Sequence, residues 1–253
     1  MLFRSSQKTG ASALGVQRVL GLGSYQTAWA GLHKLRRAMV RPGRDRLTGR
    51  VAVDETYVGG PQEGLPGRAA EEKAWVVIAA QEDGRKIGRI RMRRIPDASS
   101  RSLHGFIEDW IEPGSGVHTD GWQGYRGLKE KGYCHDVTIL EGPKQTALDL
   151  LPRVHWVGSA LKRWLVGTHQ GAVSPEHLDY YVDEFTFRFN RRTSRSRGKL
   201  FYRRLHQPVA VAPAPYGSIV RHGRGRKPER HNRYWLPESH GYPLSQVIGS
   251  KAV

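Results

Sequence analysis

The hydrophobic pattern of residues 51–58 predicts a buried β-strand. Its valines, threonine and tyrosine are β-branched or aromatic, and Gly59 and Gly60 end the run. Asp54 and Glu55 lie inside this strand and must point to opposite faces of a sheet. Because a buried charge is costly unless it is paired or bound to a metal, the strand indicates a metal site.

Further apolar segments extend this strand into a mixed α/β unit. The pattern predicts strands over residues 73–80 and 86–95, joined by a turn at Asp83-Gly84, a helix over 99–111, a short strand from Val117 to Asp120, a helix over about 121–131 and a strand over 135–140. The first three strands would form an antiparallel meander. Three strands, a helix, a strand, a helix and a strand is the order of an RNase H-like fold.

Asp120 ends the second acidic segment just before a helix-compatible run. Two strand-borne aspartates, Asp54 and Asp120, can converge on one divalent cation. The alternative is that Asp54 satisfies a local turn and Asp120 caps the following helix, because Asp is a favoured N-cap residue.

The N-terminal region has the shape of a helix-turn-helix. A brief helix is expected over residues 12–20, and Ser24 caps a second helix that extends to about Met39. The face of the second helix that we expect to be exposed carries basic residues that suit phosphate contact, Lys34, Arg36 and Arg37, followed by Arg41, Arg44 and Arg46. An ordinary helical hairpin with a solvated basic face fits the pattern equally well.

Two more helices are expected over residues 154–166 and 175–190. Ser174 caps the second of them, with Pro175 at its first position and without a capping box. A basic tract interleaved with aromatic residues, typical of nucleic-acid contact, then includes Arg188, Arg191, Arg192, Arg195, Arg197, Lys199, Arg203 and Arg204. From about Pro208 the Pro-, Gly- and Arg-rich tail is expected to be weakly ordered.

The composition narrows the class of protein. The 253 residues include 41 Lys and Arg against 23 Asp and Glu, a net charge of +18, which favours a polyanionic partner such as nucleic acid. A ribosomal or other basic scaffold would share that charge. Cys134 is the single cysteine, so no internal disulfide forms. No apolar run reaches the roughly 18 residues of a membrane span, so a cytoplasmic, nucleoid-associated protein without membrane contact is expected.

Four blocks of sequence resemble one known family. They are V-D-E-T-Y-V-G-G at 53–60, H-T-D-G-W-Q-G-Y at 118–125, L-K-R-W-L-V-G-T-H-Q-G at 161–171 and D-E-F-T-F-R-F-N-R-R at 183–192. The chain is similar to bacterial insertion-sequence transposases with a DDE-type, RNase H-like catalytic domain. The expected division is a helical DNA-binding remnant at 1–48, the catalytic domain at 49–205 and a basic tail at 206–253.

The resemblance implies two divalent ions, normally Mg²⁺, held by two aspartates and a third ligand for DNA cleavage and strand transfer. Asp54 and Asp120 match the two aspartates. Relatives carry the third ligand about 35 residues later and a basic residue two turns beyond it, positions that hold His155 and Lys162 here. An imidazole ligand would make Mn²⁺ an alternative to Mg²⁺. Glu184 is the other candidate for the third ligand, and a hydrogen-bonded core histidine is the other interpretation of His155.

The resemblance also implies double-stranded DNA as the partner and a homodimer on paired element ends. The DNA-binding residues expected are Lys34, Arg36, Arg37, Lys162, Arg163, Arg188, Arg191 and Arg192. Relatives usually begin with a cysteine-rich zinc ribbon, which this sequence does not show, and Ala160 stands where they would have Asn. The leading hypothesis is therefore a transposase. The alternatives are a truncated, inactive transposase that only binds DNA, and a nuclease with the same metal site.

Overall fold

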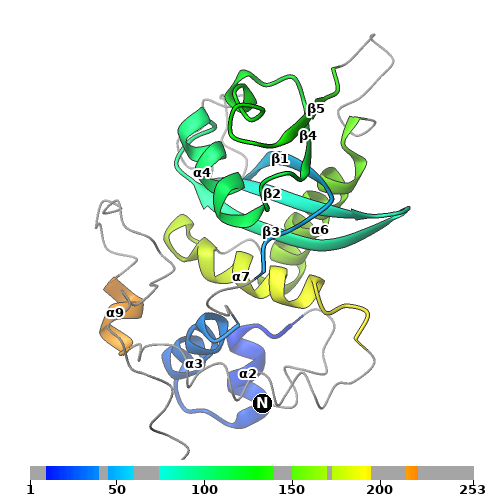
Figure 1. Cartoon of the computed structure of the whole chain (residues 1–253). Helices are drawn as coiled ribbons and strands as arrows, with labels where there is room; N and C mark the ends of the chain where they lie inside the picture. Colours follow the sequence, from blue (N-terminus) through cyan, green and yellow to red (C-terminus); the bar gives the residue numbers. More distant parts are fainter. Residues whose placement is uncertain are drawn as a thin grey trace, which may run out of the picture.

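The computed structural model describes residues 10–39, 45–59, 74–139, 150–169, 173–194 and 215–221 (Figure 1). Its helices and strands follow one another along the chain as α2 (Ala13–Leu20), α3 (Tyr25–Arg37), β1 (Arg50–Val58), β2 (Ala74–Asp83), β3 (Lys86–Ile95), α4 (Ser100–Trp110), β4 (Gly116–Thr119), η2 (Gln123–Tyr125), β5 (Cys134–Val137), α6 (Pro152–His169), η3 (Pro175–His177), α7 (Leu178–Phe189) and α9 (Tyr216–Arg221).

The strands form a five-stranded mixed sheet in the order β3-β2-β1-β4-β5. β1, β2 and β3 pair antiparallel, as the sequence pattern predicts, with left-handed Gly84 in the turn between β2 and β3. β4 pairs parallel to β1, and β5 pairs parallel to β4. An antiparallel meander joined through its first strand to two parallel strands is the RNase H-like topology, so the predicted fold class is confirmed.

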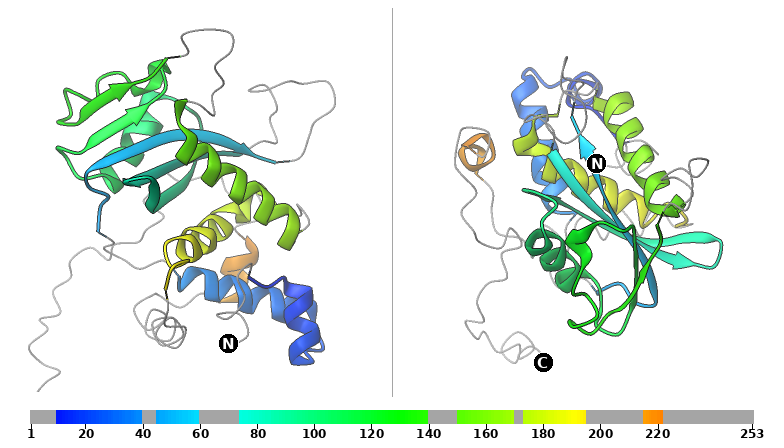
Figure 2. Two further views of the ribbon diagram at one scale, coloured as in Figure 1. Left: turned by 90° about the vertical axis from the view of Figure 1, so that its right-hand side faces the viewer. Right: turned by 90° about the horizontal axis from the view of Figure 1, so that it is seen from above.

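The two faces of the sheet pack against different helices. Ala52, Ile78 and their same-face neighbours lie in a core with α6 and α7. Val51, Val53 and Val77 lie in a second core with α4. Because successive side chains of a strand point to opposite faces, this pattern fixes the direction of every β1 residue. Figure 2 shows α6 crossing one face of the sheet, with α4 on the other side.

Two helix predictions need correction. The expected helix over 121–131 is wrong, because the chain makes only the short 3₁₀ helix η2 and then turns, with left-handed glycines at Gly127 and Gly132. The expected helix over 175–190 begins as the 3₁₀ turn η3 and becomes α-helical at Leu178. The Ser174 hydroxyl lies 2.8 Å from His177 Nδ1 in that turn.

The N-terminal helices pack on α7 through a buried ion pair. Arg36 of α3 is 1% exposed, and its Nε donates to Glu184 Oε2 of α7 over 2.8 Å. Arg188 Nε donates to the other oxygen of the same carboxylate, also over 2.8 Å. The prediction that Arg36 lies on the exposed face of its helix is therefore wrong. Sequence periodicity counted Arg36 as polar, whereas a buried carboxylate 148 residues away offsets the cost of burying its charge.

The caps of the two N-terminal helices differ. Ser12 caps α2, because its hydroxyl accepts from the Gly15 N–H over 3.1 Å. Ser24 precedes α3 as predicted, yet its hydroxyl bonds the Gln26 side chain rather than the helix backbone.

The C-terminal tail contains one short helix in its described part. This helix, α9, places Ile219 in a fully buried position. The remainder of the tail, and the part of the basic tract from Arg195 to Arg204, lie outside the described residues. In the described part of the chain, no helix is both long and apolar enough to cross a membrane.

Replacing Glu184 with Gln is expected to destabilise the protein strongly. The change removes the carboxylate charge that Arg36 and Arg188 share, and Arg36 is fully buried, so the expected cost is about 3–5 kcal/mol. Urea unfolding measures the free energy. Glu108→Gln is the matched control, because the Glu108–Lys131 pair is largely solvent-exposed and is worth at most about 1 kcal/mol. Equal small losses in both variants would contradict the role of the buried pair.

Candidate active site

The parallel pairing of β1 and β4 brings the two predicted aspartates together. Ala52 lies opposite His118 in this pairing, and β4 ends at Thr119. Asp54 and Asp120 each lie two residues beyond this last pair, and the charge of Asp120 acts on the Asp54 carboxyl. The two carboxylates therefore lie within electrostatic range of each other.

The Asp54 carboxylate lies in a strongly anionic and largely buried position. Its side chain is 15% exposed, and Oδ2 lies 3.6 Å from Nε2 of His155. Oδ1 accepts a hydrogen bond from the backbone N–H of Glu55 over 2.8 Å. Burial, followed by the charges of Glu55 and Asp120, raises the pKa of the Asp54 carboxyl from 3.8 to about 7. Lys162 opposes this shift without cancelling it.

Asp120 is held by the turn that follows β4. Its Oδ1 accepts from the backbone N–H of Trp122 over 3.0 Å, and the Thr119 hydroxyl donates to its carbonyl oxygen over 2.9 Å. The alternative weighed for Asp120 was the cap of a helix over 121–131; that helix does not form, and the carboxylate instead accepts a hydrogen bond within the turn, which orients it. One oxygen is used by the turn, so the side chain keeps a second oxygen for another partner.

Glu55 was not among the predicted site residues, yet it belongs to the same charge cluster. It points to the opposite face from Asp54, where its Oε2 accepts from the hydroxyl of fully buried Tyr125 over 2.8 Å. Burial, followed by the Glu55 charge, raises the pKa of Tyr125, which therefore stays a proton donor. The tyrosine that ends the H-T-D-G-W-Q-G-Y block was the available signal, since a buried Tyr hydroxyl usually finds a partner.

Helix α6 carries the other two predicted residues over the sheet. Its buried positions, which include Val157 and Leu161, pack in the core with α7. A Cβ added at Gly158 would lie 3.4–3.8 Å from Ile78 and Thr56, so the helix backbone packs closely on the sheet here. This close contact holds His155 next to Asp54. Lys162 reaches solvent, yet partial desolvation lowers its pKa while Asp54 acts in the opposite direction.

The first turn of α6 is fixed by Arg153. This side chain lies 3.3 Å from Glu82 Oε1 and donates to the carbonyl oxygen of Gly84 over 2.7 Å. Both partners belong to the β2–β3 hairpin, so the rotation of α6 is tied to the sheet. A tied helix gives His155 a defined position relative to β1.

Glu184, the alternative third ligand, lies away from this cluster. Its carboxylate is fully buried between Arg36 and Arg188. The proposed DNA-binding residues fall into three groups: Lys34, Lys162, Arg163 and Arg192 are exposed, Arg37 and Arg191 are half-buried, and Arg36 and Arg188 pair with Glu184. The prediction of DNA contact is therefore weakened for the last pair.

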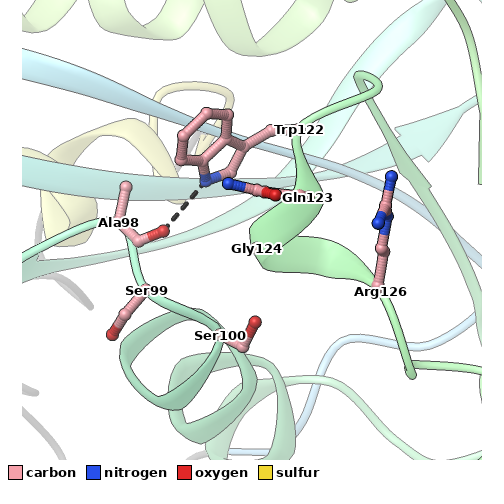
Figure 3. A pocket seen from close by; sticks show the side chains of 7 residues that line it. All are labelled: Ala98, Ser99, Ser100, Trp122, Gln123, Gly124 and Arg126. Carbon is pink, nitrogen blue, oxygen red and sulfur yellow. Dashed lines mark hydrogen bonds between the residues drawn. The ribbon is translucent and has the colours of Figure 1, made fainter.

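A shallow pocket of about 390 Å³ adjoins the turn after Asp120 (Figure 3). Trp122 forms one wall and donates from Nε1 to the carbonyl oxygen of Ala98 over 2.9 Å. A Cβ on Gly124 would lie 2.7–2.9 Å from Trp122, Ala98 and Leu103. The close approach requires glycine at this position of the motif and fixes the turn against α4.

The donor set at Asp54 fits a divalent cation in part. Two carboxylates and one imidazole supply oxygen and nitrogen ligands, and the 3.6 Å between Asp54 and His155 is near the ~3 Å that separates neighbouring ligand atoms around a small ion. The excess negative charge that raises the Asp54 pKa is what a cation would neutralise. Among the described residues, however, no group of three or more His, Cys, Asp or Glu side chains forms a ready-made metal site.

Comparison with protein-family models agrees with the sequence motifs. Residues 46–190, more than half of the chain, match the family model described as ISXO2-like transposase domain. One chain of a cryo-EM structure of the simian T-cell lymphotropic virus intasome in complex with the PP2A regulatory subunit B56 gamma is similar at 14% identity and a TM-score of 0.35. That match covers 65% of this chain and 61% of the other. No curated protein matches the chain significantly.

Asp54→Asn is expected to stabilise the metal-free protein at pH 8 and to have little effect at pH 4. Between about pH 4 and pH 7 the unfolded chain has released the Asp54 proton while the folded protein keeps it. Wild-type stability therefore falls as the pH rises through this window, by roughly 1.4 kcal/mol for each unit of the pKa difference. Asparagine does not titrate, so the variant does not lose stability between these pH values.

Urea unfolding in EDTA at both pH values measures the difference. Asp136→Asn is the control, since the Asp136 side chain is 58% exposed. If the stability difference between wild type and Asp54→Asn is the same at pH 4 and pH 8, the pKa of Asp54 is not raised by folding.

Proposed function

Because the chain belongs to the ISXO2-like transposase family, we propose that it is a metal-dependent enzyme that cleaves and joins DNA. The observation that supports the proposal most is the 3.6 Å approach of His155 to Asp54, whose carboxyl also responds to the charges of Asp120 and Lys162. The substrate is the double-stranded DNA of an insertion sequence and its target, in the cytoplasm. A homodimer would hold the two element ends.

Asp54, Asp120 and His155 are the proposed ligands of two divalent ions. When bound, such ions supply Lewis-acid stabilisation of the phosphate and a more acidic attacking hydroxyl. The residues of this chain bind and orient those groups. Because Asp54 must lose its proton before it can act as a ligand, assembly of the site is favoured above about pH 7.

Lys162 is the proposed phosphate-binding residue of the site. It lies seven residues after His155, about two helical turns, so both side chains lie on the same side of α6. Its ammonium group is exposed toward solvent while remaining close enough to Asp54 to affect that carboxyl. A cation in this position can hold a phosphate beside the carboxylates and offset their repulsion.

The wider DNA surface is proposed to use the exposed basic residues. Lys34, Arg163 and Arg192 keep solvent-accessible side chains, and the chain carries a net charge of +18. Such contacts position the duplex without reading its sequence. They are expected to make binding strongly dependent on salt.

Asp120→Ala is expected to abolish metal-dependent cleavage and joining while DNA binding persists. Losing a metal ligand should lower the rate by more than about 100-fold, since even partners outside the ligand set cost 10–100-fold. The assay uses DNA that flanks the gene, with Mg²⁺ and Mn²⁺ in parallel, and monitors strand scission and strand transfer. Asp136→Ala removes the same charge from an exposed site and should leave turnover intact.

Two results would contradict the proposal. A wild-type protein that binds DNA but turns over with neither metal would be a DNA-binding relative of the transposases. Cleavage that never yields joined products would instead indicate a nuclease.

Replacing His155 with Glu tests the third ligand through metal preference. A carboxylate is a harder ligand than imidazole, so the ratio of Mg²⁺-supported to Mn²⁺-supported activity should rise by roughly an order of magnitude. His155→Ala should lose activity with both metals. An unchanged metal ratio in His155→Glu, combined with full activity of His155→Ala, would remove His155 from the ligand set.

A further inference from the structure

Trp156 directly follows His155 on α6 and exposes 57% of its surface. Tryptophan is a large apolar side chain that is usually well buried. A single exposed apolar residue needs no special explanation. Trp156 differs because it lies next to His155 of the proposed site and because its ring contacts a buried aromatic side chain of α7.

The buried aromatic side chain that contacts Trp156 is Phe189 of α7. The Trp156 and Phe189 ring centroids lie 6.1 Å apart at an angle of 65°, and Phe189 is largely buried. The Arg192 guanidinium lies 4.0 Å from the Phe189 ring and donates to the carbonyl oxygens of Phe189 and Ile87. One side of the indole therefore rests on a fixed surface, while much of the ring faces solvent.

The surroundings of Trp156 favour an anionic partner. Helix α6 has no Asp or Glu in its eighteen residues. Arg163 lies seven residues after Trp156, about two turns, and so projects from the same face of the helix. Ala160 lies between them in the sequence and adds no charge or bulky side chain to this stretch of the helix. An aromatic surface flanked by cations is typical of proteins that bind unpaired bases and their phosphates.

We infer that Trp156 stacks on an unpaired DNA base next to the phosphate that the site acts on. The inference rests on the proposed function for the identity of the substrate. Bases inside a duplex are covered on both faces, so an exposed indole can stack only on a base at a frayed end or one that has left the helix. Trp156 is a positioning residue: it holds the distorted strand while Arg163 binds the adjoining backbone.

Binding of the full chain to oligothymidine and to a duplex of matched length, in EDTA, tests this inference. Trp156→Ala should weaken single-strand binding about tenfold, the lower part of the range for one stacked base, and change duplex binding by less than about twofold. Trp156→Phe keeps an aromatic face and should recover most of the affinity. Val166→Ala, at another exposed apolar position of α6, is the control and should bind both like wild type.

Fluorescence gives a second measurement that does not depend on the alanine variant. Oligothymidine should quench wild-type emission more than Trp156→Phe emission, because the stacked indole is lost in the variant. Equal quenching, or equal loss of single-strand and duplex binding in Trp156→Ala, would overturn the inference. So would conversion of a dimer to a monomer by Trp156→Ala with an unchanged preference between the two DNAs, which would identify a protein interface.

These outcomes separate the inference from the proposed function. Selective loss of single-strand binding in a protein that never cleaves DNA would support stacking and contradict catalysis. Normal cleavage together with unchanged DNA preference in Trp156→Ala would support catalysis and contradict stacking.

Discussion

The parallel pairing of β1 with β4 is the constraint on which the site depends. The pairing ends at Ala52 and His118, two residues before Asp54 and Asp120, and leaves the two carboxylates within electrostatic range of each other. Two carboxylates on neighbouring strands repel each other, and burial prevents water from screening them. Burial and this repulsion destabilise the charged form of Asp54, and the pKa of its carboxyl is therefore raised. A pair of this kind is stable when a proton or a cation supplies the missing positive charge.

The position of His155 next to Asp54 depends on how α6 and α7 are held against the sheet. Arg153 ties the first turn of α6 to the β2–β3 hairpin, and close packing of Gly158 on Thr56 and Ile78 holds His155 near Asp54. The buried Arg36–Glu184–Arg188 cluster in turn fixes α7 to the N-terminal helices. Site geometry thus depends on contacts between segments that are far apart in the sequence.

The sequence predicted those parts of the fold that are set by local pattern. Runs of β-branched and other apolar residues located β1, β2 and β3, and helical spacing placed helices over 12–20 and 99–111, where α2 and α4 lie. It failed where a tertiary contact decides the outcome. Arg36 was assigned to solvent because its counter-charge, Glu184, lies in a distant helix. Residues 121–131 were assigned to a helix because the pattern did not weigh the left-handed conformations of Gly127 within the segment and of Gly132 directly after it.

Binding of Mn²⁺ to the metal-free protein tests the central claim most directly. Calorimetric titration near pH 6.5, in buffers of different ionisation enthalpy, measures both affinity and proton release. Binding is expected to release up to one proton from Asp54, and Asp54→Asn should lose both the release and most of the affinity. Equal Mn²⁺ affinity in wild type and Asp54→Asn, or binding without proton release, would show that Asp54 and Asp120 do not form a cation site.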